Sequence, residues 1–152
     1  MNALEFLIQD HRRQQDFLCQ ISSAQDTERR DLYAKFRENL IKHVNIEEEI
    51  FYPRLKKIPS FEEPVLEALE EHNLCMQLLQ ELDDLDPQDK LFKAKLKLLT
   101  DLTLKHIEAE EQILFPMVRE LASTEYLSDM GAQMRVHHQH TDPEKVLYPD
   151  QK

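Results

Sequence analysis

Residues 43–53 read HVNIEEEIFYP and residues 106–116 read HIEAEEQILFP, so one pattern occurs twice in the chain. In both stretches a histidine is followed four residues later by a glutamate, and then by a second acid, an isoleucine, an aromatic residue and a proline at matching positions. Residues four apart share one face of an α-helix. Each stretch therefore predicts a helix that presents a histidine and a glutamate to the same neighbour. The closing prolines, Pro53 and Pro116, are expected to end or kink their helices.

Apolar residues extend this face on both sides of each stretch. Leu40 precedes the first histidine and Ile50 follows its glutamate, while Leu102 and Ile113 take the same places in the second stretch. Spacings of three and four residues are typical of an amphipathic helix whose apolar side is buried. The histidines and glutamates of both stretches are therefore expected in the interior of the protein.

Two more helices each place one histidine on an apolar face. Both histidines follow leucine-containing stripes, and an acid directly precedes each of them, Asp10 before His11 and Glu71 before His72. Each acid-histidine pair stands at a similar distance before one of the two repeats. The chain is therefore expected to consist of two helix pairs that meet around a pseudo-two-fold axis.

The composition supports an all-α fold. Among 152 residues, Gly131 is the single glycine and no Asn-Gly turn occurs, so tight β-hairpins are not expected. We predict an antiparallel up-down-up-down four-helix bundle over residues 1–122, followed by a short C-terminal extension over residues 123–152. In the extension we expect a short helix near residues 123–134 and a loose or docked tail with three solvated histidines, His137, His138 and His140.

Capping signals set the expected helix boundaries. The first helix spans about residues 2–22. Ser60 and Glu63 have the spacing of a capping box for the third helix, and Asp86 followed by Pro87 is a suitable start for the fourth. The predicted apolar faces of the third and fourth helices include Leu66, Leu91, Ile113 and Leu121.

Four histidines and two glutamates are thus expected to converge inside the bundle. A buried carboxylate without a partner costs several kcal/mol, and few basic residues lie on the same faces to compensate two of them. Two divalent cations would supply the missing charge, and imidazole with carboxylate suits iron, manganese or zinc. The alternative is a metal-free bundle with hydrogen-bonded core histidines, which leaves both buried glutamates unexplained. The predicted metal ligands are His11, His43, Glu47, His72, His106 and Glu110.

With these residues the chain resembles the hemerythrin-like, or HHE cation-binding, family over about residues 4–121. The resemblance implies a non-haem di-iron centre with an oxo or hydroxo bridge, in which the four histidines are terminal ligands and Glu47 and Glu110 bridge two iron ions. It leaves open which two histidines share an iron. A ferritin-like centre is not expected because no histidine has a glutamate three residues before it, and a metalloprotease His-Glu-x-x-His motif is also absent.

The sequence departs from the oxygen-carrying hemerythrins at one position. Those proteins place a second histidine four residues after the one on the third helix, where this chain has Met76. We expect solvent, rather than Met76 or Cys75, to take the vacated coordination position. Unless Cys75 is that ligand, Cys19 and Cys75 are both expected to be small buried thiols. Open positions on both metals favour binding or reduction of a small molecule over simple oxygen transport.

The favoured function is a binding module without catalytic residues, which binds or senses dioxygen or another small diatomic ligand at the di-iron centre. The alternatives are a di-iron reductase or repair protein acting on nitric oxide, peroxide or iron-sulfur clusters, and an iron buffer. The sequence leaves open whether the protein is an enzyme and whether the bundle forms a homodimer.

The net charge of the chain limits the classes of partner that we expect it to bind. A net charge of −11 repels phosphate backbones and anionic membrane surfaces, so neither nucleic acid nor a membrane is an expected partner. The first residues lack a basic segment followed by a long apolar run, and no segment has the roughly 18 apolar residues that span a bilayer. A cytoplasmic location is therefore expected.

Overall fold

The computed structural model describes residues 1–150 and confirms an all-helical fold, with no strand in that range. Eight α-helices are joined by short connections, two π-helical turns and one 3-10 turn. The α-helices are α1 (Ala3–Ser23), α2 (Asp26–Ile46), α3 (Tyr52–Leu55), α4 (Glu62–Asp83), α5 (Lys90–Ala109), α6 (Phe115–Leu121), α7 (Thr124–His140) and α8 (Pro143–Leu147). The π turns are η1 (Glu47–Phe51) and η3 (Glu110–Leu114), and the 3-10 turn is η2 (Pro59–Phe61).

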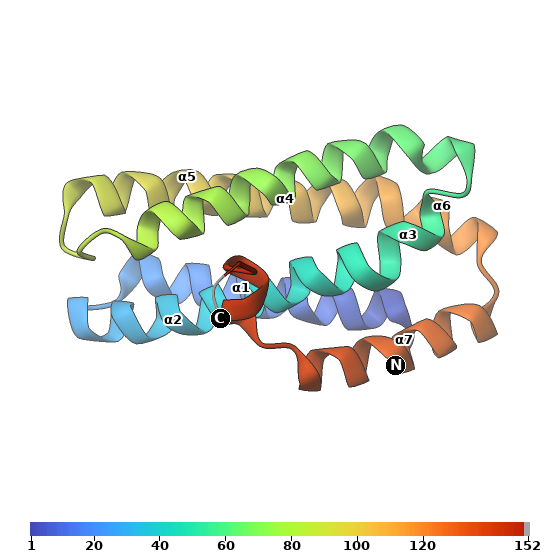
Figure 1. The fold of residues 1–152 in the computed structure, drawn as a ribbon, viewed down its shortest axis with the longest axis horizontal. Helices are drawn as coiled ribbons and strands as arrows, with labels where there is room; N and C mark the ends of the chain where they lie inside the picture. The colour runs from blue at the N-terminus through green and yellow to red at the C-terminus, as the bar shows by residue number, and fades with distance from the viewer. Residues whose placement is uncertain (151–152) are drawn as a thin grey trace.

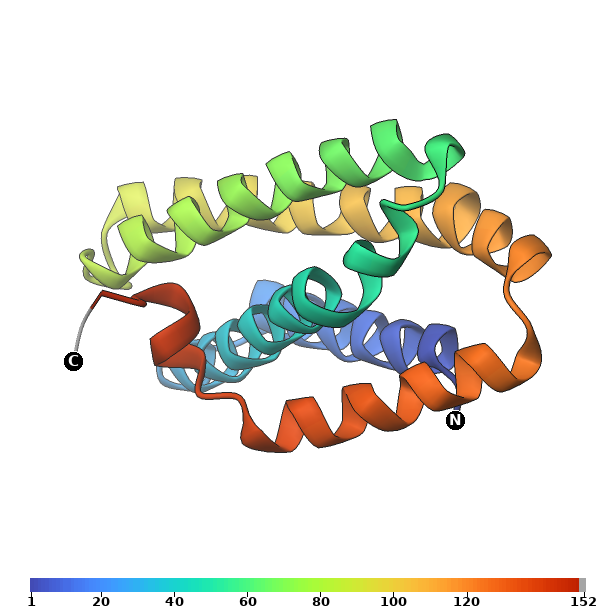
Figure 2. The same cartoon turned by 45° about the vertical axis from the view of Figure 1, so that its right-hand side comes forward.

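Four long helices form the bundle. Figure 1 shows α1 and α2 side by side in one layer and α4 and α5 in the other, with the chain reversing direction at the turn inside each pair. The helix α7 of the C-terminal extension lies along the α1–α2 layer, on the side away from α4 and α5 (Figure 2). None of the described helices is long and apolar enough to cross a bilayer.

The two prolines of the repeat do not end their helices, because each follows a π turn through which the helix continues. Proline lacks an N–H and its ring collides with the carbonyl four residues earlier in an α-helix, so a widened turn accommodates it. The backbone N–H of Tyr52 bonds to the carbonyl of Glu47, and the N–H of Phe115 bonds to that of Glu110. Both π turns therefore begin at the two glutamates of the predicted metal site, and the chain bends toward α4 after the first (Figure 2).

The helix ends differ in part from the predicted boundaries. The Asn2 side chain caps α1 in a reciprocal capping box with Glu5. The capping box expected from Ser60 and Glu63 is wrong, because Ser60 lies in the 3-10 turn and α4 begins without a side-chain cap. The fourth bundle helix begins at Lys90 rather than at Pro87, because Asp89 accepts a hydrogen bond from the next turn and serves as its N-cap.

Two apolar clusters fill the bundle, one toward each end. The first core cluster includes Leu7, Phe61 and Phe115, and the second includes Phe36 and Leu79. The helices α1, α2 and α4 contribute residues to both clusters, whereas α5 contributes to the second and the following η3 and α6 contribute to the first. The predicted metal ligands are buried but belong to neither cluster. The bundle therefore has a polar layer between two apolar ends.

Four residues assigned to apolar faces are instead half or more exposed, which corrects that part of the prediction. In each case a residue near in sequence is buried in its place, for example Val65 beside Leu66 and Leu114 beside Ile113. Helical spacing alternates between three and four residues, so a stripe can be traced one residue off the true face. The exposed fractions are 53% for Leu66, 50% for Leu91, 59% for Ile113 and 62% for Leu121.

The C-terminal extension is more ordered than the expected short helix and loose tail. The α7 helix runs past residue 134 to His140, and α8 docks on α2 through the buried Leu147. Residues 151–152 of the extension lie outside the described residues. Gly131 sits in α7 where it crosses the start of α1, and a Cβ there would lie 2.6 Å from the carbonyl oxygen of Met1. The single glycine therefore permits this close helix crossing.

Candidate metal centre

A buried polar layer crosses the middle of the bundle. It contains six side chains, called here the six inner residues, from α1, α2, α4 and α5 and from the first position of each π turn. None of them is more than 7% exposed. The structure thus brings together all the residues that the sequence singled out as metal ligands, namely His11, His43, Glu47, His72, His106 and Glu110.

The Nε2 atoms of the four imidazole rings point toward the two carboxylates. Glu47 Oε1 lies 3.2 Å from Nε2 of His43 and 3.1 Å from Nε2 of His72. Glu110 Oε1 takes the equivalent position, 3.1 Å from Nε2 of His11 and 3.4 Å from Nε2 of the histidine four residues before it. Each carboxylate therefore contacts one histidine from each helix pair, which is the position of a bridging group.

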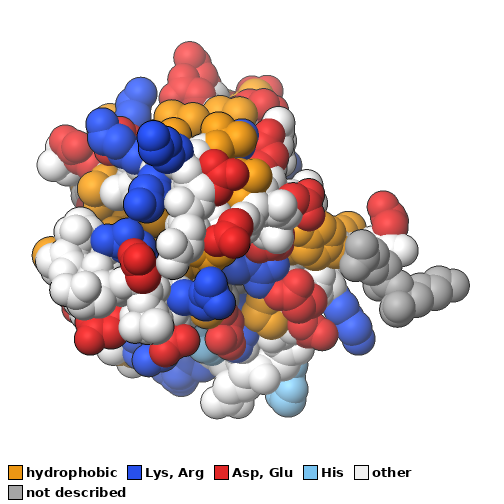
Figure 3. All heavy atoms as spheres, turned by 90° about the vertical axis from the view of Figure 1, so that its left-hand side faces the viewer, with side chains coloured by type: hydrophobic (Ala, Val, Ile, Leu, Met, Phe, Trp, Pro, Cys, Tyr) orange, Lys and Arg blue, Asp and Glu red, His pale blue; other side chains and the backbone are white. Residues whose placement is uncertain are grey.

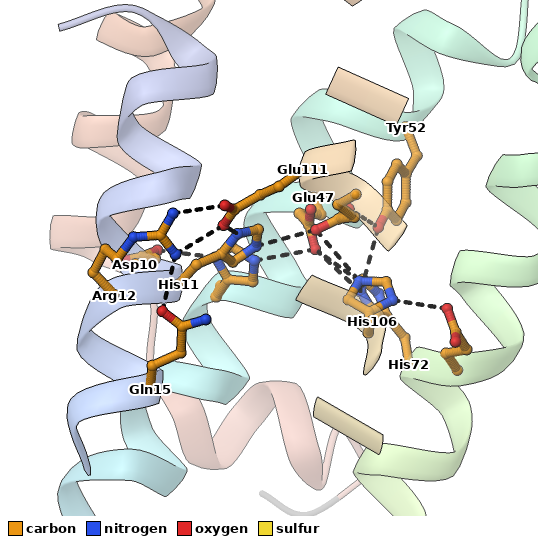
Figure 4. Close-up of polar contacts among 12 residues, drawn as sticks. Asp10, His11, Arg12, Gln15, Glu47, Tyr52, His72, His106 and Glu111 are labelled. Atoms are coloured by element: carbon orange, nitrogen blue, oxygen red, sulfur yellow. Dashed lines mark hydrogen bonds and ion pairs between the residues drawn. The ribbon is translucent and has the colours of Figure 1, made fainter. Parts of the chain in front are cut away.

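The six inner residues divide into two candidate cation sites that share a carboxylate. Figure 4 shows His11 on one side of Glu47, and His72 with His106 on the other. The histidines therefore pair within the helix pairs α1–α2 and α4–α5, a question that the sequence left open. In each site the ligand atoms lie within 4.8 Å of one another: one site comprises His11, His43, Glu47 and Glu110, and the other comprises Glu47, His72 and His106.

The other nitrogen of every ring, Nδ1, contacts a second carboxylate. When Nδ1–H is donated to an acid, the tautomer is fixed and the lone pair of Nε2 is left for a cation. All four rings therefore have the orientation that metal-binding histidines adopt. The contacts, made with what we call the four outer acids, are His11 to Glu111 at 2.7 Å, His43 to Asp10 at 3.1 Å, His72 to Glu48 at 2.9 Å and His106 to Glu71 at 2.8 Å.

The two pairs of histidine rings have nearly the same local geometry. The rings of His11 and His43 have centroids 4.9 Å apart and an interplanar angle of 58°. The rings of His72 and His106 repeat this arrangement at 4.8 Å and 57°. The two halves of the chain have therefore built the same local geometry.

Electrostatic pairing decides the charge of these buried groups. Burial lowers the pKa of His43, but the charge of Glu47 and the hydrogen bond with Asp10 outweigh it and raise that pKa to about 10. Burial likewise opposes ionisation of Glu47, but the charge of His43 holds the pKa of that carboxyl well below its usual range. The pKa of His106 is raised well above its ordinary value in the same way, because Glu110 outweighs burial. Protons on the rings thus occupy the positions that a cation would take.

Two buried polar atoms of the layer show that the residues fit a metal. Glu47 Oε2 and His43 Nε2 are fully enclosed and have no hydrogen-bond partner. In addition, the Nε2 atoms of His72 and His106 lie only 3.2 Å apart. Buried polar atoms without a hydrogen-bond partner and facing ring nitrogens are unfavourable in a protein interior unless a cation lies between them.

One tyrosine breaks the symmetry of the centre. The buried hydroxyl of Tyr52 donates a 2.7 Å hydrogen bond to Glu110 Oε2 and lies 3.5 Å from Nε2 of His72. The equivalent residue of the second repeat is Phe115, whose ring stacks on His11 at 5.8 Å. A hydrogen-bond donor is therefore present on the α4–α5 side of the centre and an apolar ring on the other.

The sulfur-containing residues lie outside the inner layer. Met76 is partly buried against the second core cluster, and Cys75 is buried with a pKa that burial raises to about 11, so its thiol stays protonated. Among the described residues, the two groups with metal-ligand geometry include neither of them. Cys19 is exposed, which corrects the expectation that both thiols are buried.

Sequence reasoning assigned no role to the four outer acids or to Tyr52. The signal for the acids was present, because an acid stands directly before His11 and His72 and directly after Glu47 and Glu110. It was missed because adjacent residues of a helix point in different directions, so each acid contacts a histidine of another helix instead of the histidine or glutamate next to it in sequence. The signal for the tyrosine was the position before the proline, where the repeats carry Tyr52 and Phe115, which differ by a hydroxyl group.

Comparisons with known proteins agree with this geometry. The family model of the hemerythrin HHE cation binding domain matches residues 2–118. A curated DNA nickase from Nostoc sp. is 23% identical over 136 residues, which cover 89% of this chain and only 38% of that relative. A solved hemerythrin HHE cation binding domain-containing protein from Mycobacterium kansasii superposes with a TM-score of 0.78 at 21% identity, covering 97% of both chains. The last comparison shows the shared fold.

Proposed function

This chain belongs to the hemerythrin HHE cation-binding domain family, and from that membership we propose that it holds two iron ions which bind dioxygen or a related small molecule. His11 and His43 hold one ion, and His72 and His106 hold the other. Glu47 and Glu110 bridge the two ions and, with an oxo or hydroxo group, balance their charge.

One observation carries this proposal. The four Nε2 atoms converge on two shared carboxylates, while the four Nδ1 atoms are each held by an outer acid. A structural core does not need four histidines that share one orientation, whereas a pair of cations does. Imidazole and carboxylate ligands without a thiolate suit iron, and they also admit manganese or zinc.

The protein's own groups determine what the centre can do. When bound, a di-iron group supplies chemistry that the side chains lack, the donation of two electrons to a small molecule. Each half of the site offers only two imidazoles beside the shared carboxylates, which leaves room for an external ligand. The Tyr52 hydroxyl can donate a hydrogen bond at the α4–α5 side, and the first core cluster keeps bulk water from the layer.

Anaerobic reduction of the iron-loaded protein, followed by exposure to dioxygen, to peroxide and to nitric oxide, tests this function. Absorption spectra would report ligand binding, and an added electron donor would report turnover. A reversible spectrum with dioxygen and no turnover supports the binding module. Steady consumption of nitric oxide or peroxide would instead support the reductase. Iron uptake and release without a spectrum of either kind would support an iron buffer.

We do not propose nucleic acid as a partner of this protein. The Nostoc relative is named a DNA nickase, but more than half of that protein lies outside the match. The net charge of this chain is −11, and Figure 3 shows Lys and Arg side chains interspersed with acidic ones on one end of the bundle. A phosphate backbone finds no extended basic surface on that face.

A further inference from the structure

The two halves of the centre differ in how they are covered from outside. On the α1–α2 side, α7 packs over both helices and over η1, so that Ile50 is only 8% exposed. On the α4–α5 side no described helix takes that place, and the equivalent residue Ile113 is 59% exposed. The fold is therefore closed over one pair of histidines and less covered over the other.

A cavity opens on the less covered side. It has a volume of about 110 Å³ between α4 and α5, and its lining includes Ala68, Glu71, His106, Ala109 and Glu110. Two of these, His106 and Glu110, are inner residues, so the cavity borders the inner layer. Two other hollows contact the outer acids Glu48 and Glu111, but neither is lined by an inner residue.

The repeat explains why the cavity occurs on one side. Ala109 directly precedes Glu110, and the residue in the same place before Glu47 is Ile46, which is fully buried. Ala68 stands four residues before His72, and the residue in the same place before the histidine of α1 is a fully buried leucine, Leu7. Ala68 and Ala109 thus leave space on the α4–α5 side, whereas Leu7 and Ile46 fill the equivalent space on the α1–α2 side. Protein interiors are packed too densely for a molecule to pass where large side chains meet.

The charge around the cavity selects what can enter. Glu67 and Glu71 both line it, and no Lys or Arg does. The Glu71 carboxylate accepts a hydrogen bond from His106, while Glu67 is exposed at the cavity. Carboxylates repel anions and leave uncharged molecules unaffected.

We propose that this cavity is the entrance through which small uncharged molecules, of the size of dioxygen, nitric oxide or hydrogen peroxide, reach the metal held by His72 and His106. Ala68 and Ala109 set its width. The inference rests on the proposed function, because it requires a metal at that position.

The substitution Ala109→Ile tests the entrance with the residue that the other repeat carries. Ala109 is exposed, so the larger side chain is tolerated by the fold, and Ala94→Ile makes the same change at an exposed position of α5 away from the cavity. Nitric oxide binding to the iron-loaded, reduced protein is followed by stopped-flow absorption. Ala109→Ile should slow binding at least about tenfold at unchanged iron content, because the larger side chain fills the cavity and interiors are densely packed elsewhere, while Ala94→Ile should match the unmodified protein.

Ala68→Leu, which narrows the cavity from inside, should slow binding in the same way. A second measurement does not depend on the metal: crystals of the metal-free protein under xenon pressure should hold xenon in the cavity, and Ala109→Ile crystals should not. Equal nitric oxide rates in Ala109→Ile and Ala94→Ile, at equal iron content, would overturn the inference and leave the proposed function standing. If the unmodified protein fails to bind iron, or binds iron but none of dioxygen, peroxide and nitric oxide, the proposed function fails, while the xenon experiment still decides whether the cavity admits a small molecule.

Discussion

The Asp10 carboxylate lies 3.1 Å from Nδ1 of His43, on the neighbouring helix, although Asp10 is next in sequence to His11. The other three outer acids behave alike, so that α1 contacts α2, η1 contacts α4, α4 contacts α5, and η3 contacts α1. These contacts form a closed ring around the inner layer. The outer acids therefore orient the histidines and connect the four bundle helices at the same time.

Removing one outer acid should weaken metal binding without removing a ligand. Glu71→Gln takes away the carboxylate that holds Nδ1 of His106, and such changes typically cost about 10- to 100-fold in metal affinity. Competition with a chelator of known affinity measures the loss. Glu70→Gln, at an exposed neighbouring position, removes the same charge and should leave the affinity unchanged. Equal affinities in both variants would show that the outer contact does not position the ring.

The Tyr52 hydroxyl should contribute to stability as well as to the site. In Tyr52→Phe, the buried Glu110 Oε2 loses its 2.7 Å donor, and hydrogen bonds to charged groups contribute about 1.5–3 kcal/mol. Urea unfolding of the metal-free protein should show a loss of that size. Tyr126→Phe removes a hydroxyl from an exposed side chain and serves as the control. A loss no greater than that of the control would contradict the assigned role.

Replacing the single glycine, Gly131, by alanine should destabilise the protein. In an ordinary helix interior, Gly131→Ala would stabilise the protein by about 0.5–1 kcal/mol. Here the new Cβ would lie 2.6 Å from the carbonyl oxygen of Met1 and 2.9 Å from the backbone nitrogen of Ala3, so we expect a net loss of about 1–3 kcal/mol. Thermal unfolding gives the sign, with Ser128→Ala in the same helix as a change without a collision. A stabilised Gly131→Ala protein would mean that α7 does not cross α1 this closely.

The two cysteines should differ sharply in reactivity. Cys75 is 4% exposed and burial raises its pKa to about 11, so at pH 8 only about one thiol in a thousand is the reactive thiolate. Because that pKa is raised, reactivity should increase only as the pH approaches 11. Mass spectrometry after iodoacetamide treatment at pH 8 should find Cys19 modified and Cys75 intact. Comparable labelling of both in the folded protein would contradict the buried position of Cys75.

Much of the fold and of the inner layer could be predicted because the same His-x-x-x-Glu pattern occurs twice on an apolar helix face. A histidine and a glutamate four residues apart, on an apolar face, have few explanations in a helical protein, and the structure places His43 and Glu47 as that spacing requires. The helix pairing followed from short connections. These features depend on helical periodicity, which the sequence displays directly.

The remaining features depend on contacts between helices, which periodicity does not display. The partner of Asp10 is on another helix, so its role is visible only when α1 and α2 are side by side. The π turn at Glu47 inserts an extra residue that an ideal α-helical pattern does not anticipate. The coverage of one half by α7 depends on how closely Gly131 approaches α1.

Anomalous diffraction at the iron absorption edge, from crystals of the iron-loaded protein, would locate the metal ions among the six inner residues. We predict two peaks about 3.5–4 Å apart, as in carboxylate-bridged metal pairs. One should lie beside His11 and His43 and the other beside His72 and His106, with Glu47 between them. A single peak, or a pair of peaks away from these side chains, would contradict a di-iron centre at the six inner residues.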